Sequence, residues 1–289
     1  MSKKLITGVC VALILIAIYF GIKMYASNVA EKKIAKAIAS LADYVDVNYR
    51  KVSVDLLGLD VHISDVLVSP ANAKEKVKIN EIVIYDVDQN SEVPTFLNLS
   101  LNGIEADLNE FGSKADGIRK LGYNDKLLLN VKIEYDYNKE KKELSLKQFK
   151  VGADDVGDIG VNIHLGNIDL STEKIGGIIF TWPQIMLHEA KIGYEDHSLV
   201  GRLLKLAAKN GNINVNDFRT YVIQEIEKEI EKEKDEFNRN ALKEMRDFIE
   251  HPEQFSISIS PPEPLPLGRI ISVNDPKDII KLLNMKIES

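Results

Sequence analysis

The side chains that could do chemistry are few and scattered along the chain. None of the five histidines belongs to an HExxH or similar ligand spacing. His62 and His164 fall on the polar parity of alternating segments, so surface-exposed side chains are expected there. The spacing predicts no metal ligand, and a metal site assembled from distant segments stays open. The histidines are His62, His164, His188, His197 and His251.

A carboxylate-rich turn and the remaining motifs give no signal of catalysis. "DDVGD", residues 154–158, holds three carboxylates, but the EF-hand spacing and its closing glutamate are absent, so a solvated hairpin turn is expected. The sequence has no G-x-S-x-G elbow, and "KNGNIN" lacks the lysine-serine pair of a phosphate loop. We predict a protein that is not an enzyme, with no catalytic residue, metal or cofactor.

Composition narrows the class of partner. The 289 residues are 45% hydrophobic and 28% charged, which is enough apolar material for a sizeable core. A net charge of −7 argues against nucleic acid, because binding phosphates needs a basic surface. The single cysteine, Cys10, excludes an intrachain disulfide and a thiolate metal site.

An apolar segment near the N-terminus predicts a membrane anchor. "LITGVCVALILIAIYFGI", residues 5–22, is eighteen residues without a charge, enough to cross a hydrocarbon core. A cleaved signal peptide is the alternative, but no small-x-small cleavage pair follows. Lys3 and Lys4 favour an N-terminus inside and a C-terminal body outside. The expected anchor residues are Leu13, Ile14, Ile16, Tyr19 and Phe20.

Two N-terminal segments precede the predicted sheet. We predict that residues 1–25 form a cytoplasmic tail and the transmembrane anchor, and that residues 26–44 form a juxtamembrane helix. Ile34, Ile38 and Leu41 share one face of that helix. We expect it to pack on the folded body, with contact to anionic lipid as the alternative.

From residue 45 the apolar period changes from 3.6 to two, which predicts an antiparallel β-rich domain over residues 45–195. In four successive segments the alternation slips by one residue, as between Leu101 and Ile104, which is typical of a β-bulge. Hairpin-length connections such as "NKEKKE" favour a meander.

Helical periodicity returns over residues 196–250. A first helix is expected to end at Gly211, and residues 217–250 are expected to form one long helix or two collinear helices broken near Lys234. Residues 251–289 supply a strand, a proline-rich crossover and a short helix opened by Asp275 and Pro276. The expected fold class is α+β: an N-terminal transmembrane helix, then a curled antiparallel β-sheet meander with a C-terminal helical segment packed on it.

The predicted strands carry one apolar face, and little helix is available to hide it. Covering that face is worth about 25 cal/mol per Å² of apolar surface. The cover could be the curled sheet itself, the helices, or lipid, and all three stay open. If lipid is the cover, the groove candidates are Val54, Leu56, Leu59, Val61, Ile63, Ile82, Ile84, Leu99 and Leu101.

A family resemblance rests on the segments "KKIAKAIASLADYVDVNYRKVSVDL", "GLDVHISDVLVSP" and "VKINEIVIYDV". Their succession after an apolar segment resembles the opening of AsmA-like bacterial envelope proteins, over roughly residues 5–110. The resemblance implies a single-pass bacterial inner-membrane protein with its C-terminal domain in the periplasm, and lipid handling through an apolar groove. The chain is short, and its helical segment is not part of that opening.

Two hypotheses of function follow. In the first, the β-rich domain binds or shields the acyl chains of inner-membrane lipid and serves envelope lipid homeostasis. In the second, a scaffold engages an envelope protein or a second copy through the helix of residues 217–250. The partner-helix candidates, which repeat by four, are Phe218, Val222, Ile226 and Ile230.

Overall fold

The structure of the chain is a computed structural model, and it describes residues 45–55, 60–70, 76–88, 91, 94–171 and 177–289. The strands are β1 Val45–Asn48, β2 Lys51–Val54, β3 Val61–Pro70, β4 Val77–Val87, β5 Phe96–Asp107, β6 Lys126–Asn138, β7 Glu143–Ala153, β8 Gly157–Gly166, β9 Met186–Asp196, β10 Gln254–Ile259, β11 Leu265–Pro266 and β12 Lys286–Glu288. The helices are η1 Leu108–Ala115, α3 Asp116–Lys120, α4 Ile178–Thr181, η3 Trp182–Gln184, α5 Leu199–Asn210, α6 Val215–Lys232, α7 Glu236–Glu250, α8 Leu267–Ile271 and α9 Pro276–Leu283.

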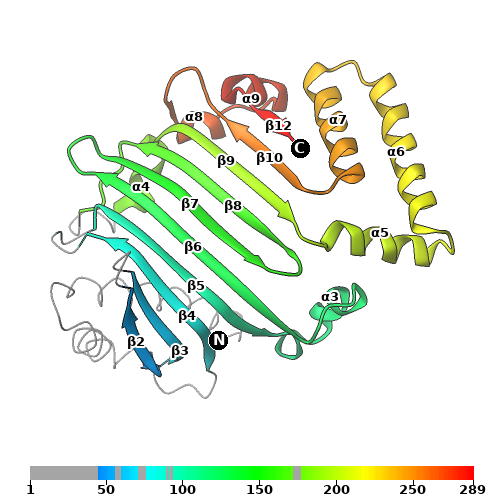
Figure 1. Cartoon of the computed structure of the whole chain (residues 1–289). Helices are drawn as coiled ribbons and strands as arrows, with labels where there is room; N and C mark the ends of the chain where they lie inside the picture. Colours follow the sequence, from blue (N-terminus) through cyan, green and yellow to red (C-terminus); the bar gives the residue numbers. More distant parts are fainter. Residues whose placement is uncertain (1–44, 56–59, 71–75, 89–90, 92–93, 172–176) are drawn as a thin grey trace.

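All of these strands belong to one antiparallel sheet of 12 strands (Figure 1). Its order is β1-β3-β4-β5-β6-β7-β8-β9-β10-β12, with β2 also pairing with β3 and β11 with β9. Consecutive strands from β3 to β9 are neighbours, as the short connections predict. Within the described residues the two edges do not pair with each other, so the sheet is open.

One row of apolar side chains crosses this sheet from edge to edge. Cross-strand partners lie on the same face, because side chains alternate along each strand. The row therefore places its members on one face, which we call the apolar face. It consists of Val54, Val61, Ile84, Leu99, Ile133, Phe149, Val161, Ile192, Ile257 and Ile287.

The apolar face is buried over strands β3 to β6. Ile79 and Leu101 are 0% exposed there, and Leu99 is 1% exposed. Partly buried side chains of β1 and β2, including Val47 and Val52, pack against this cluster. The first half of the sheet therefore carries the largest hydrophobic core of the described chain.

The parity slips of the sequence coincide with irregular backbone on adjacent strands. The β5–β6 register shifts between Leu101 and Ile104, as predicted, and Gly103 in this bulge has a φ of 67°. A Cβ on Gly103 would overlap Asn80 of β4, so this close approach requires glycine. On β3, Asp65 has a φ of 52° between Ile63 and Val66. Each irregularity keeps the apolar side chains of its strand on one face.

The helical segment is a hairpin rather than one long helix. The predicted break near Lys234 is confirmed, since α6 ends at Lys232 and Asp235 caps α7 through the Asn238 amide. The two helices contact each other and lie side by side (Figure 1), so the expectation of a collinear pair was wrong. Three residues between them, Glu233 to Asp235, are enough for the chain to reverse direction.

Specific contacts hold α5 against the connection before β6, and caps set the two ends of α9. Arg202 of α5 lies 4.2 Å from the Tyr123 ring and donates hydrogen bonds to the carbonyls of Leu121 and Gly122. Near the C-terminus, Asp275 caps α9 and Pro276 is its first residue, as predicted. Asn284 ends α9 in the left-handed conformation, with a φ of 45°.

The predicted fold class was wrong. The structure has a large open sheet of 12 strands that includes β10, β11 and β12 of the C-terminal region, in place of a curled meander confined to residues 45–195. The hairpin of α6 and α7 flanks the β10–β12 edge and does not lie across the sheet (Figure 1). Among the described helices none is long and apolar enough to cross a membrane, and the predicted anchor lies outside the described residues.

Candidate functional site

Within the described residues, the apolar face loses its cover over strands β7 to β10. Phe149 is 37% exposed, Ile159 is 56% exposed and Ile192 is 52% exposed. Val161 and Ile257, which lie beside them in register, are half-buried. We call these five residues the apolar strip. It continues the buried core of the first half of the sheet, because Ile133 packs on that core and pairs with Phe149.

Helices bound the apolar strip at both ends of its strands. At one end, Phe248 of α7 lies 6.1 Å from the Tyr194 ring and 5.5 Å from the Phe255 ring. At the other end, Leu283 of α9 is buried with Leu187 of β9. Along β9, Ile192 therefore stands between two covered positions, and the strip runs across the strands between two helical walls.

The predicted groove residues lie in the other half of the sheet. Val61, Ile63, Ile82, Ile84, Leu99 and Leu101 are 0–7% exposed and belong to the buried core. Val54 is partly buried against that core, and Leu56 and Leu59 lie outside the described residues. The structure thus brings the described candidates together on one face, as their parity predicted, and places them beneath the protein surface.

The predicted partner-helix residues lie outside the sheet, and the predicted membrane-anchor residues lie outside the described residues. The partner-helix candidates all lie on α6 and are half-buried, and within α6 and α7 no residue is fully buried. The expected anchor residues lie outside the part of the chain that the structure describes. These two sets are Phe218, Val222, Ile226 and Ile230, and Leu13, Ile14, Ile16, Tyr19 and Phe20.

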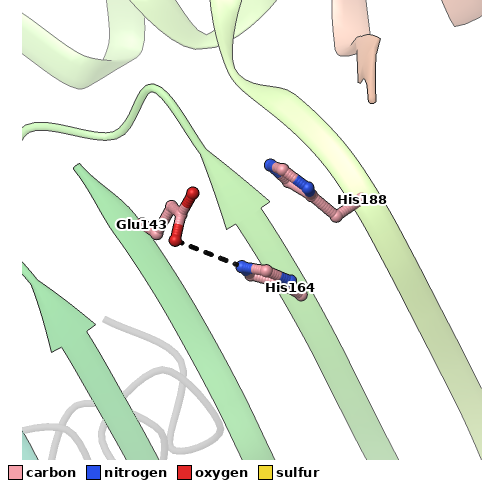
Figure 2. A group of neighbouring side chains, drawn as sticks. All are labelled: Glu143, His164 and His188. Carbon is pink, nitrogen blue, oxygen red and sulfur yellow. Dashed lines mark ion pairs between the residues drawn. The ribbon is translucent and has the colours of Figure 1, made fainter. Parts of the chain in front are cut away.

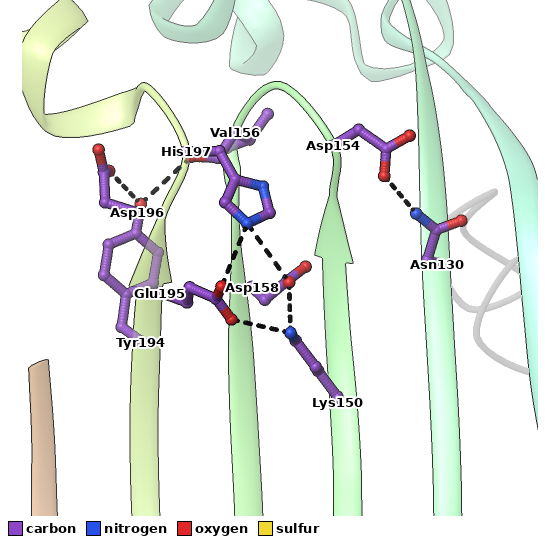
Figure 3. Close-up of polar contacts among 9 residues, drawn as sticks. All are labelled: Asn130, Lys150, Asp154, Val156, Asp158, Tyr194, Glu195, Asp196 and His197. Atoms are coloured by element: carbon purple, nitrogen blue, oxygen red, sulfur yellow. Dashed lines mark hydrogen bonds and ion pairs between the residues drawn. The ribbon is translucent and has the colours of Figure 1, made fainter. Parts of the chain in front are cut away.

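The opposite face of β7 to β9 is polar and carries a charged cluster (Figure 3). Lys150 Nζ lies 2.6 Å from Asp158 Oδ2 and 2.9 Å from Glu195 Oε2. These contacts, the hydrogen bond to Asp158 first, raise the pKa of Lys150 above its usual value. His197 Nε2 lies 3.6 Å from Asp158 Oδ2. The carboxylates of Asp158 and Glu195 therefore contact both the Lys150 ammonium and the His197 imidazole.

The carboxylates of the "DDVGD" turn, residues 154–158, have structural partners in and beside the charged cluster. The β7–β8 hairpin confirms the predicted turn, and its Asp154 accepts a hydrogen bond from Asn130. At the same end of these strands but on the apolar face, the Tyr194 hydroxyl donates to Asp196 at 2.7 Å (Figure 3). Burial, followed by this hydrogen bond, raises the pKa of the Tyr194 phenol well above its usual value. The cluster therefore holds its charges in pairs and ties β8 to the start of α5.

A second polar group lies at the other end of the same strands (Figure 2). Glu143 of β7, His164 of β8 and His188 of β9 have ligand atoms within 4.8 Å of one another. The rings of His164 and His188 are stacked, with centroids 4.3 Å apart, and His164 Nε2 lies 3.9 Å from Glu143 Oε2. Within the described chain, this triple and the group of Asp158, Glu195 and His197 could each hold a metal ion.

Sequence reasoning missed both the apolar strip and the histidine group. The alternation of β7, β8 and β9 predicted which side chains share a face, but it contains no information on which part of that face is covered. His164 and His188 are 24 positions apart, so no ligand spacing could reveal them. Only the pairing of β8 with β9 brings them together.

One comparison with known proteins finds a match in the C-terminal part of the chain. A family model described as "Uncharacterized protein" matches residues 150–289. The matched region contains β8 to β12, the helices α5 to α9 and four of the five residues of the apolar strip. No curated protein matches the chain. In the part of the chain that the structure describes, fold and site define an open antiparallel sheet whose apolar face is partly uncovered.

Proposed function

We propose that the apolar strip binds the acyl chains of lipid. The exposure of Phe149, Ile159 and Ile192 on adjacent strands carries the proposal. Single exposed apolar residues are common on proteins, whereas a contiguous row that continues a core marks a binding surface. An acyl chain seated there would complete the hydrophobic core without requiring a hydrogen-bond partner.

The dimensions of the row suit a long apolar ligand. From Ile133 to Ile287 it crosses five inter-strand spacings, about 24 Å in all. The helical walls at Phe248 and Leu283 leave the direction across the strands open. We therefore infer that the acyl chain lies across β7 to β10, perpendicular to the strands, and that its polar head group lies beyond the row.

A photoactivatable fatty acid tests where such a ligand lies. Irradiation of the full chain with this probe, followed by peptide mass spectrometry, should label peptides of β7 to β10 that contain Phe149, Val161 or Ile192. An excess of unlabelled fatty acid should suppress the labelling. Labelling confined to α6 and α7, or labelling that the competitor does not reduce, would contradict the proposal.

A scaffold function is the second candidate. It is supported by the hairpin of α6 and α7, where no residue is fully buried and Tyr221 is exposed. The polar side of α6 is exposed to solvent and carries ion pairs such as Lys228 with Glu225, which leaves the other side of the helix for a second chain. A photo-crosslinking amino acid at position 221 should then yield one crosslinked product of defined mass. If only the monomer is recovered, the hairpin has no such role.

The proposed location remains that expected from the sequence. The resemblance to AsmA-like proteins and the apolar residues 5–22 support an envelope protein beside the inner membrane. A lipid ligand agrees with that setting, because the membrane would supply it. The absence of a recognisable catalytic motif supports a protein that binds lipid without converting it.

A further inference from the structure

We propose that Glu143, His164 and His188 bind a divalent transition-metal ion of the Zn²⁺ class. The proposal goes beyond lipid binding, because this group lies on the polar face of the sheet, opposite the apolar strip. Two imidazoles and one carboxylate are a ligand set that Zn²⁺ accepts, and three protein ligands leave a fourth position for water. The three side chains come from three adjacent strands (Figure 2).

A β-bulge places His188 beside His164. On β9, Glu189 pairs with His164 and Leu187 pairs with Leu165, so His188 is an extra residue between two paired positions. In a regular ladder, alternation would place residues 188 and 189 on opposite faces. The bulge redirects the His188 side chain so that the two imidazole rings stack 4.3 Å apart. Bulges are common next to functional sites because they change the direction of one side chain.

Gly166 provides the space for this arrangement. A Cβ at position 166 would lie 2.6 Å from His188 Nε2, which is closer than van der Waals contact allows. The glycine thus permits the imidazole nitrogen to lie against the end of β8, on the side of His164 and Glu143. The backbone conformation at this position does not itself require glycine, because Gly166 does not have a positive φ.

The distances fit a site that closes on its ion. Ligand atoms around tetrahedral Zn²⁺ are about 3.3 Å apart, given metal–ligand distances of about 2.0–2.2 Å. The present separations, up to 4.8 Å, need movements of about 1.5 Å, which rotations of the side chains supply.

The second candidate group is a weaker metal site because it already holds a cation. The ammonium of Lys150 lies between Asp158 and Glu195, where a metal ion would have to displace it. Around Glu143, by contrast, the ion pairs within the described chain include His164 but no lysine or arginine. The charge balance therefore distinguishes the two groups.

Titration of the metal-free full chain with Zn²⁺ against a chromogenic chelator tests the proposal. One Zn²⁺ per chain should bind. Loss of a second-shell partner costs metal affinity about 10–100-fold, so His164→Ala or His188→Ala should each lower the affinity at least about 100-fold. Gly166→Ala should lower it about 10-fold or more, and circular dichroism would confirm that each variant is folded.

Two histidine variants outside the proposed site serve as matched controls. His62 lies 3.0 Å from Glu81 on the polar face of β3 and β4 and has no second histidine beside it, so His62→Ala should retain full Zn²⁺ affinity. His197→Ala, in the other candidate group, should retain it as well. Failure of the full chain to bind Zn²⁺ would overturn the proposal, as would unchanged affinity in folded His188→Ala or an equal loss in His197→Ala.

Discussion

Replacing Ile192 by aspartate is expected to lower the affinity for a long-chain fatty acid about tenfold or more. Full burial of an isoleucine is worth about 1.5–3 kcal/mol, and 52% of this side chain is still exposed in the free protein. About half of that free energy is therefore available to a ligand, and about 1.4 kcal/mol corresponds to a factor of ten. The aspartate adds the cost of desolvating a charge when an acyl chain covers it.

The same substitution at a second exposed isoleucine provides the control for this prediction. Ile271, the last residue of α8, is 67% exposed and is not part of the apolar strip. Ile271→Asp should leave fatty-acid affinity unchanged, and both variants should unfold at nearly the wild-type temperature. Titration with a fluorescent fatty acid measures the difference. Equal affinities for wild type and Ile192→Asp would mean that the strip is not the binding surface.

Replacing Leu101 by alanine is expected to lower the free energy of unfolding by about 3–4 kcal/mol. Leu101 is 0% exposed and belongs to the core of β3 to β6, where deleting a leucine side chain leaves a cavity as well as losing buried surface. Ile82 and Val131, its cross-strand partners, are part of the same cluster, so the cavity would be bounded by a regular sheet that relaxes little. Urea unfolding followed by circular dichroism measures the change.

Leu128→Ala is the matched control for the core prediction. Leu128 is 44% exposed on β6 and points away from the apolar face, since its neighbour Leu129 packs on the core. Its loss should change the free energy of unfolding by about 0.5 kcal/mol or less. If Leu101→Ala cost as little as Leu128→Ala, Leu101 would line an accessible groove and the division of the apolar face into core and strip would be wrong.

The local features of the fold could be predicted because they depend on neighbouring residues. The alternation of β6, the turn between Asn138 and Glu143, and the bulge between Leu101 and Ile104 all leave a direct pattern in the sequence. The same holds for Asp275 at the start of α9. The sheet as a whole could not be predicted, because β10 and β12 pair with strands far away in the sequence. Periodicity does not encode such pairing.

The candidate sites were beyond prediction for a related reason. Val61 and Ile192 show the same alternation in their strands, yet one is 5% exposed and the other 52%. The difference depends on which segments cover each half of the sheet, and strand patterns contain no information on that. His188 would be assigned to the wrong face by simple alternation from Glu189, because the bulge in β9 has no glycine or proline to reveal it.

Native mass spectrometry of the full chain, extracted gently in detergent, tests most directly whether the apolar strip binds lipid. We predict a species heavier than the bare chain by the mass of one lipid or fatty acid, and its absence from Ile192→Asp under the same conditions. A delipidated sample should regain the adduct when fatty acid is added. Recovery of the bare chain alone, with no uptake of added fatty acid, would contradict the account.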